Sequence, residues 1–165
     1  MNRTEYQRTL FETAMLVMVC DGDINDREIA EMRAAFDNSI LFQDLTFEEE
    51  LARLLEELQR DKQKVVLDYF SKIETEDLTP VQKLQILEIA LRIVYADDRV
   101  EPNEVRFVTL LKSRLQVMDE ILFRRFGEVE FLSGNRSHEK QSESARSLID
   151  SIELPDFGDL VDISK

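Results

Sequence analysis

The strongest constraint on the fold of this chain is an internal repeat with an offset of 76 residues. Shifted by that offset, residues 20–29 lie over residues 96–105, and acidic and aliphatic positions coincide. The matched pairs are Asp21 with Asp97, Ile24 with Val100, Glu28 with Glu104 and Ile29 with Val105. The repeat predicts two similar units, each consisting of a buried helix, an acidic loop and an amphipathic helix.

Helical spacing of apolar residues accounts for most of the rest of the sequence, and no stretch alternates as a strand would. The segments before the two loops are apolar on almost every side near their ends, which places them in the middle of a core. We expect helices over residues 5–20, 26–36, 47–58, 61–73, 80–96, 102–115 and 117–126. The sequence therefore predicts an all-α bundle of about seven helices built from two pseudo-symmetric halves.

Three helix starts carry recognisable signals. Thr46, with a glutamate three residues on, has the spacing of a capping box, in which side chain and backbone bond reciprocally. Thr79 is followed by Pro80 and Gln82, which combines an N-cap, a proline at the first helical position and a capping partner. Pro102 marks a third start in the same way. We predict that helices begin at these positions.

The composition changes after residue 132. Residues 133–147 are rich in serine and nearly devoid of apolar side chains, so we expect a disordered polar linker. Beyond it, apolar residues alternate with acids in an acidic-hydrophobic tail that either docks on the core or binds a partner. The predicted division is a helical domain over 1–132 and a linker and tail over 133–165. Because the second part carries seven acids and four bases, 1–132 retains −11 of the total charge of −14.

Charge and side-chain inventory exclude several classes of function. A net charge of −14 repels nucleic acid and anionic membrane surfaces and favours cations or a basic protein partner. With one histidine, His138, and one cysteine, Cys20, the chain lacks the parts for disulfide frameworks, zinc sites or Cys–His catalysis. We predict a protein without catalytic activity, with Cys20 packed in its core. No leader or membrane span is visible, and a single cysteine suits the cytoplasm.

The acidic loops admit two interpretations. Asp21, Asp23, Asn25 and Glu28 supply oxygen ligands of the kind that Ca²⁺, Mn²⁺ or Mg²⁺ binds, although the EF-hand pattern breaks off after its start. The other interpretation is local. Glu28 and Glu104 occupy the third position of their helices, where a glutamate caps the helix start and complements its dipole.

The two loops resemble those of the TerB-like (tellurite resistance protein B) domain, whose pattern is Ala/Cys-Asp-Gly-x-Ile/Val-x-x-x-Glu. The resemblance covers residues 5 to 130 and implies a two-part helical domain associated with tellurite and stress resistance. It implicates Asp21, Glu28, Asp97 and Glu104 as metal ligands. The second loop departs from the pattern, because Asp98 replaces the glycine and Arg99 stands where the first loop has Asp23.

Together these observations predict a cytoplasmic interaction module of TerB type with a divalent cation at its acidic loops. The candidate ligands are Asp21, Asp23, Asn25, Glu28, Asp97, Asp98 and Glu104. The alternative is a metal-independent adaptor that binds a protein partner and whose acidic loops serve only as helix caps.

Overall fold

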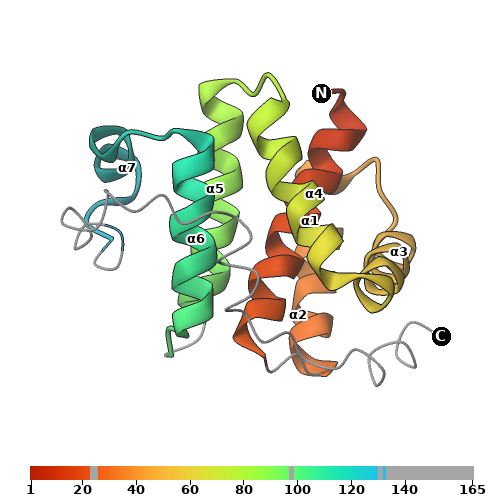
Figure 1. The fold of residues 1–165 in the computed structure, drawn as a ribbon. Helices are drawn as coiled ribbons and strands as arrows, with labels where there is room; N and C mark the ends of the chain where they lie inside the picture. Colours follow the sequence, from red (N-terminus) through yellow and green to blue (C-terminus); the bar gives the residue numbers. More distant parts are fainter. Residues whose placement is uncertain (23–25, 97–98, 130–131, 133–165) are drawn as a thin grey trace.

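The computed structural model describes residues 1–22, 26–96, 99–129 and 132, except for the side chain of Asp21. Within these residues the chain forms seven α-helices and one short 3₁₀ helix, with no strand (Figure 1). The helices are α1 (Arg3–Asp21), α2 (Asp26–Asp37), η1 (Ile40–Phe42), α3 (Phe47–Arg60), α4 (Lys62–Thr75), α5 (Pro80–Ala96), α6 (Pro102–Leu115) and α7 (Asp119–Phe126). The predicted all-α class and the number of helices are confirmed, and the pseudo-symmetry of the halves stays a prediction.

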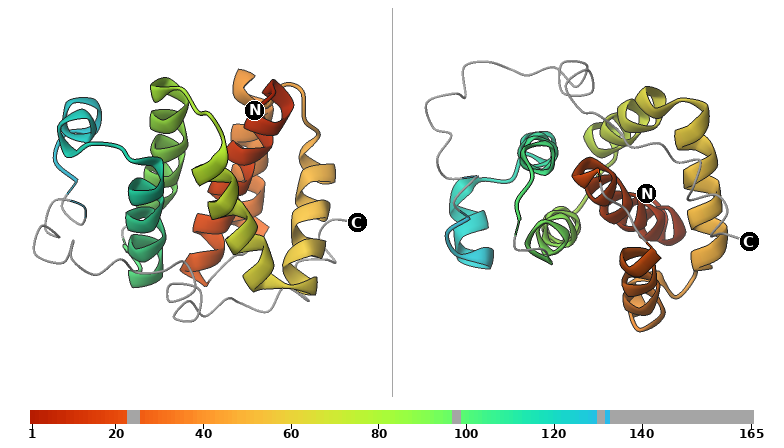
Figure 2. Two further views of the ribbon diagram at one scale, coloured as in Figure 1. Left: turned by 45° about the horizontal axis from the view of Figure 1, so that its top comes forward. Right: turned by 90° about the horizontal axis from the view of Figure 1, so that it is seen from below.

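Helix α1 is the centre of the bundle. Every residue from 9 to 20 is buried, as expected for a helix without a polar face. Viewed along the bundle, α1 lies inside a ring of the other helices, with α3 and α4 on one side and α5 and α6 on another (Figure 2). Cys20 lies in this buried stretch, so its predicted place in the core is confirmed.

Local signals explain where the helices begin and end. The Asn2 side chain accepts a hydrogen bond from the backbone amide of Glu5, and Gly22 caps the end of α1 with a φ of 79° that suits glycine. At α5 the predicted capping box is present, with Thr79 and Gln82 bonded reciprocally at 2.9 and 3.2 Å. At α3 the predicted start is right but the capping box is wrong. The Thr46 side chain makes no cap hydrogen bond, and acids in the first turn complement the helix dipole instead.

Two aromatic clusters fill the core on opposite sides of α1. Phe11 of α1 meets Phe36 and Phe47 edge to face, with ring centroids 5.9 and 5.8 Å apart, which joins α1 to α2 and α3. On the other side Tyr69 packs against Phe107, which joins α4 to α6. Edge-to-face and offset contacts of this kind add to the stabilisation from burial alone. Both repeats of the predicted sequence pattern therefore share one continuous core.

Helices α1 and α5 run parallel, and this arrangement places both acidic loops at the same end of the bundle. At the start of the two helices, Tyr6 donates a hydrogen bond to the side-chain oxygen of Gln85. Both helices then run downward in Figure 1, and α2 and α6 return from that lower end. The chain passes from α1 to α2 and from α5 to α6 there. Residues 23–25 and 97–98 within these connections lie outside the described residues, as do the predicted linker and tail over 133–165.

Candidate functional site

The loop end of the bundle is built around Glu104, which stands in the first turn of α6. Its side chain is buried, with the residue only 3% exposed. Its carboxylate accepts a hydrogen bond from the backbone amide of Glu101 at 3.4 Å, as in a capping box, and Pro102 begins the helix. The predicted role of Glu104 as a helix cap is therefore confirmed. Its burial sets it apart from ordinary capping acids, which lie on the surface.

Glu104 also reaches the other repeat, because its charge acts on the thiol of Cys20 near the end of α1. The pKa of Cys20 rises to about 12, first because burial disfavours the thiolate and second because the negative charge of Glu104 is near. The two residues are 84 positions apart in the sequence, and the contact of α1 with α6 brings them together. An acid of the second loop thus lies beside the helix that leads into the first.

Two arginines described at this end pair with near neighbours. Arg27 in the first turn of α2 bonds Glu31 at 3.1 Å on the surface. Arg99 lies 3.5 Å from Glu101, so its charge is directed to that acid. Glu28, half-buried, stands in the first turn of α2 as predicted. Acids in the first turns of α2 and α6 complement the positive ends of both helix dipoles.

The predicted ligand set is only partly within view. Glu28 and Glu104 are described, and the helix α1 ends at Asp21. The side chain of Asp21 and the whole of Asp23, Asn25, Asp97 and Asp98 lie outside the described residues. Within the described part of the chain, no three or more His, Cys, Asp or Glu side chains are grouped closely enough to hold a metal ion. The metal site stays a prediction.

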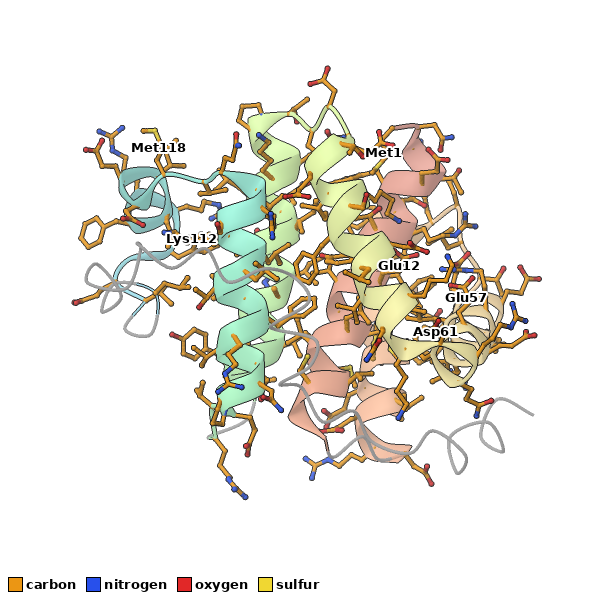
Figure 3. The ribbon with its side chains drawn as sticks, viewed as in Figure 1. Met1, Glu12, Glu57, Asp61, Lys112 and Met118 are labelled. Atoms are coloured by element: carbon orange, nitrogen blue, oxygen red, sulfur yellow. The ribbon has the colours of Figure 1, made fainter. Side chains whose placement is uncertain are left out.

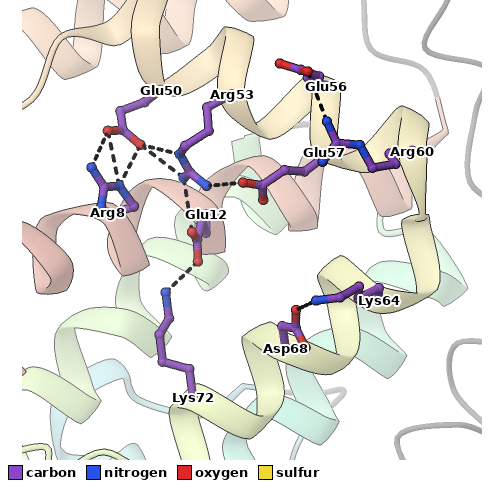
Figure 4. Close-up of polar contacts among 10 residues, drawn as sticks. All are labelled: Arg8, Glu12, Glu50, Arg53, Glu56, Glu57, Arg60, Lys64, Asp68 and Lys72. Carbon is purple, nitrogen blue, oxygen red and sulfur yellow. Dashed lines mark hydrogen bonds and ion pairs between the residues drawn. The ribbon is translucent and has the colours of Figure 1, made fainter.

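A second charged centre, which the sequence did not reveal, connects α1, α3 and α4 (Figure 4). Glu50 of α3 accepts hydrogen bonds from Arg8 of α1 and Arg53 of α3, both at 3.0 Å. Arg53 also forms an ion pair with Glu12 at 3.1 Å, and Glu12 forms a second ion pair with Lys72 of α4 at 2.8 Å. Helices α1, α3 and α4 are thereby connected by one chain of ion pairs.

The electrostatics of this network favour the charged forms. Burial raises the pKa of Glu50, but hydrogen bonds and charge from Arg8 and Arg53 outweigh it and lower the pKa overall. Three helical positions, Phe47, Glu50 and Leu54, share the buried face of α3, so helical spacing alone would have placed Glu50 inward. Its partners depend on tertiary packing.

The comparisons with known proteins bear on the whole helical part. The sequence matches the family described as "Tellurite resistance protein TerB" over residues 8–124, from the first turns of α1 into α7. No curated protein and no solved structure gives a significant match. In the described part of the chain, no helix is both long and apolar enough to span a bilayer. The match includes both acidic loops and all seven α-helices in whole or part, and the chain therefore belongs to the TerB family.

Proposed function

We propose that this TerB-family chain is a non-catalytic, stress-associated cytoplasmic module whose two acidic loops together bind a divalent cation and present it to a protein partner. The observation that supports this most is the position of Glu104, buried at the start of α6 and close enough to Cys20 to raise its pKa. The start of α6, which follows the second loop in the sequence, is thus near the end of α1, which precedes the first loop.

A shared site needs both loops at one end of the molecule, and the parallel arrangement of α1 and α5 provides this (Figures 1 and 2). Ca²⁺ takes six to eight oxygen ligands, more than one short loop readily supplies. Of the residues present, Glu28 and Glu104 are described at this end, and Asp21 and Asp97 stand at the equivalent loop starts. Carboxylate and amide oxygens suit Ca²⁺, Mn²⁺ or Mg²⁺ rather than a thiolate-binding metal.

The energetics are consistent with a bound cation. A divalent cation between the loops would reduce the mutual repulsion of the loop acids. The partner that such a surface suits is basic, because 1–132 carries −11 of the net charge.

Unfolding of the full chain tests the cation. After treatment with EDTA, we expect Ca²⁺, Mn²⁺ or Mg²⁺ at a hundredfold excess over its Kd to stabilise the protein by about 2.7 kcal/mol. The double variant Asp21→Asn with Asp97→Asn should lose this gain, and Glu104→Gln should reduce it. Glu49→Gln, in the acidic first turn of α3, is the matched control and should keep it. No gain in the wild type, or an equal gain in the double variant, would contradict the proposal.

The second candidate function is a metal-independent adaptor, and the hydrogen bond from the Glu101 amide to Glu104 favours it. In that case the loop acids are caps, and partner capture is unchanged by EDTA. Pull-down with the full chain and with a chain shortened after residue 132, each with and without EDTA, separates the two functions. It also locates the partner on the bundle or on the segment after it.

A further inference from the structure

The surface around α7 carries several exposed apolar side chains. Seven large hydrophobic side chains of the described residues are exposed, and three of them fall within six positions: Met118, Ile121 and Phe123. Phe123 is 62% exposed. Helix α7 stands beside α6 at the edge of the molecule, away from α1 (Figures 1 and 3). It is attached through ion pairs of Lys112 with Asp119 and of Arg125 with Glu88.

Next to this helix lies a hollow of about 490 Å³, which we call the α7 hollow. Its apolar lining consists of Leu122 and Phe123 from α7 and Val129 and Leu132 from the segment after α7. Three acids, Asp119, Glu120 and Glu128, also line the hollow, together with a single base, Arg124. Because acids outnumber the base, apolar contact and not charge attraction would hold an acidic segment there.

The chain itself supplies an apolar segment close to this hollow. Leu132 is part of the lining, and the predicted polar linker over 133–147 begins at the next residue. A random-coil linker of that length has a root-mean-square span of roughly 20 Å, so the residues beyond the linker are tethered near the hollow. Those residues, 148–163, include eight apolar side chains and five acids but no base.

We infer that residues 148–163 dock in the α7 hollow of their own chain and cover Phe123 and its exposed neighbours. A tethered segment has an effective concentration in the millimolar range, so even a weak contact is largely formed. The eight apolar side chains of the segment would fill the hollow, and this apolar contact has to outweigh repulsion between its five acids and the three lining acids. This inference does not depend on the proposed cation at the loop end, so either proposal can be contradicted while the other stands.

Hydrogen exchange of the full chain, read by mass spectrometry, tests the docking. Amides of 148–163 should exchange at least about tenfold more slowly than an unstructured peptide. Phe123→Asp should abolish that protection, and Ile40→Asp should not, although Ile40 is the more exposed side chain at 81%. Phe157→Asp, within the segment, should remove the protection and speed exchange in α7. A synthetic peptide of residues 148–163 added to the Phe157→Asp chain should restore the protection of α7.

Each other outcome overturns the inference. Unprotected amides in 148–163 of the wild type would mean that the segment does not dock within its own chain. Protection that Phe123→Asp leaves intact would mean that it docks elsewhere. Protection that increases with protein concentration would identify a second copy as the occupant. If Phe123→Asp fails to fold, as exchange in α1 would reveal, the Phe157→Asp chain and the peptide decide the question.

Discussion

Glu50 and Glu104 are two buried glutamates whose burial is compensated in different ways. They are 6% and 3% exposed, and each stands in the first turn of a helix that packs against α1. Glu50 is held by the guanidinium groups of Arg8 and Arg53 from two helices. Glu104 accepts a hydrogen bond from the backbone at the start of its own helix and places its charge beside Cys20.

The difference separates a structural part of the molecule from a candidate functional part. Around Glu50, carboxylates and cations alternate from Arg8 to Lys72, so the network holds α1, α3 and α4 together without any ligand. At the loop end, acids recur at equivalent helix starts, and we propose that a divalent cation binds there. Removing one member of the first set should therefore cost stability under all conditions, while changes in the second should depend on what is bound.

The largest effect is expected from Arg53→Met, which keeps an unbranched apolar stem and removes the guanidinium charge. Arg53 bonds Glu12, Glu50 and Glu57 within 3.1 Å. Breaking a buried pair costs about 3–5 kcal/mol, and because Arg53 is partly exposed and Arg8 remains, we expect about 2 kcal/mol. Denaturant unfolding measures this loss.

The matched control is Arg60→Met, on the same helix. Arg60 and its partner Glu56 are both more than 70% exposed, so we expect a loss below about 0.5 kcal/mol. Equal losses in the two variants would show that the buried network contributes no more than surface pairs do. The proposed contrast between the two centres would then fail.

A smaller effect on stability is expected when the pH is lowered, and it tests the role of the ion pairs around Glu50. The pKa of Glu50 in the folded chain lies below its ordinary value of 4.5. The ion pairs of Glu50 therefore contribute their full stabilisation of the folded chain at pH values above 4.5. That contribution disappears as the pH falls through the lower folded-state pKa, because the protonated carboxyl no longer attracts Arg8 and Arg53. The stability difference between wild type and Arg53→Met should therefore narrow at and below pH 4.5. A difference that is the same at pH 7 and pH 3 would contradict this.

Much of the fold was accessible from the sequence because it depends on local periodicity. Helices α1 and α5 follow from dense apolar spacing, and the cap formed by Thr79 and Gln82 follows from four consecutive residues. The cap at Thr46 was wrong because sequence spacing permits a side-chain bond but does not require it. The 3₁₀ turn η1 and the exposed face of α7 had no periodic signal.

The two charged centres also differ in how far the sequence alone predicts them. Glu104 was singled out because the repeat places an acid at the same position in each half, which is a property of the sequence alone. The partnership of Glu12 with Arg53 and Lys72 joins residues up to 60 positions apart, so it depends entirely on how α1, α3 and α4 pack. Repeats thus reveal candidate sites, while tertiary packing determines which charges are compensated.

The smallest effect is expected in the reaction rate of the Cys20 thiol, which reports on the contact between α1 and α6. A pKa of about 12 instead of 9.0 leaves roughly a thousandfold smaller thiolate fraction at pH 8, so the native thiol should react very slowly with a disulfide reagent. Because burial is the larger cause of the shift, Glu104→Gln should speed labelling by less than about tenfold. Glu120→Gln, on the exposed side of α7, should leave the rate unchanged once rates are corrected for measured stability. If labelling in Glu104→Gln is as slow as in the wild type, the charge of Glu104 does not reach α1. The two loops would then lack the electrostatic link on which a shared cation site depends.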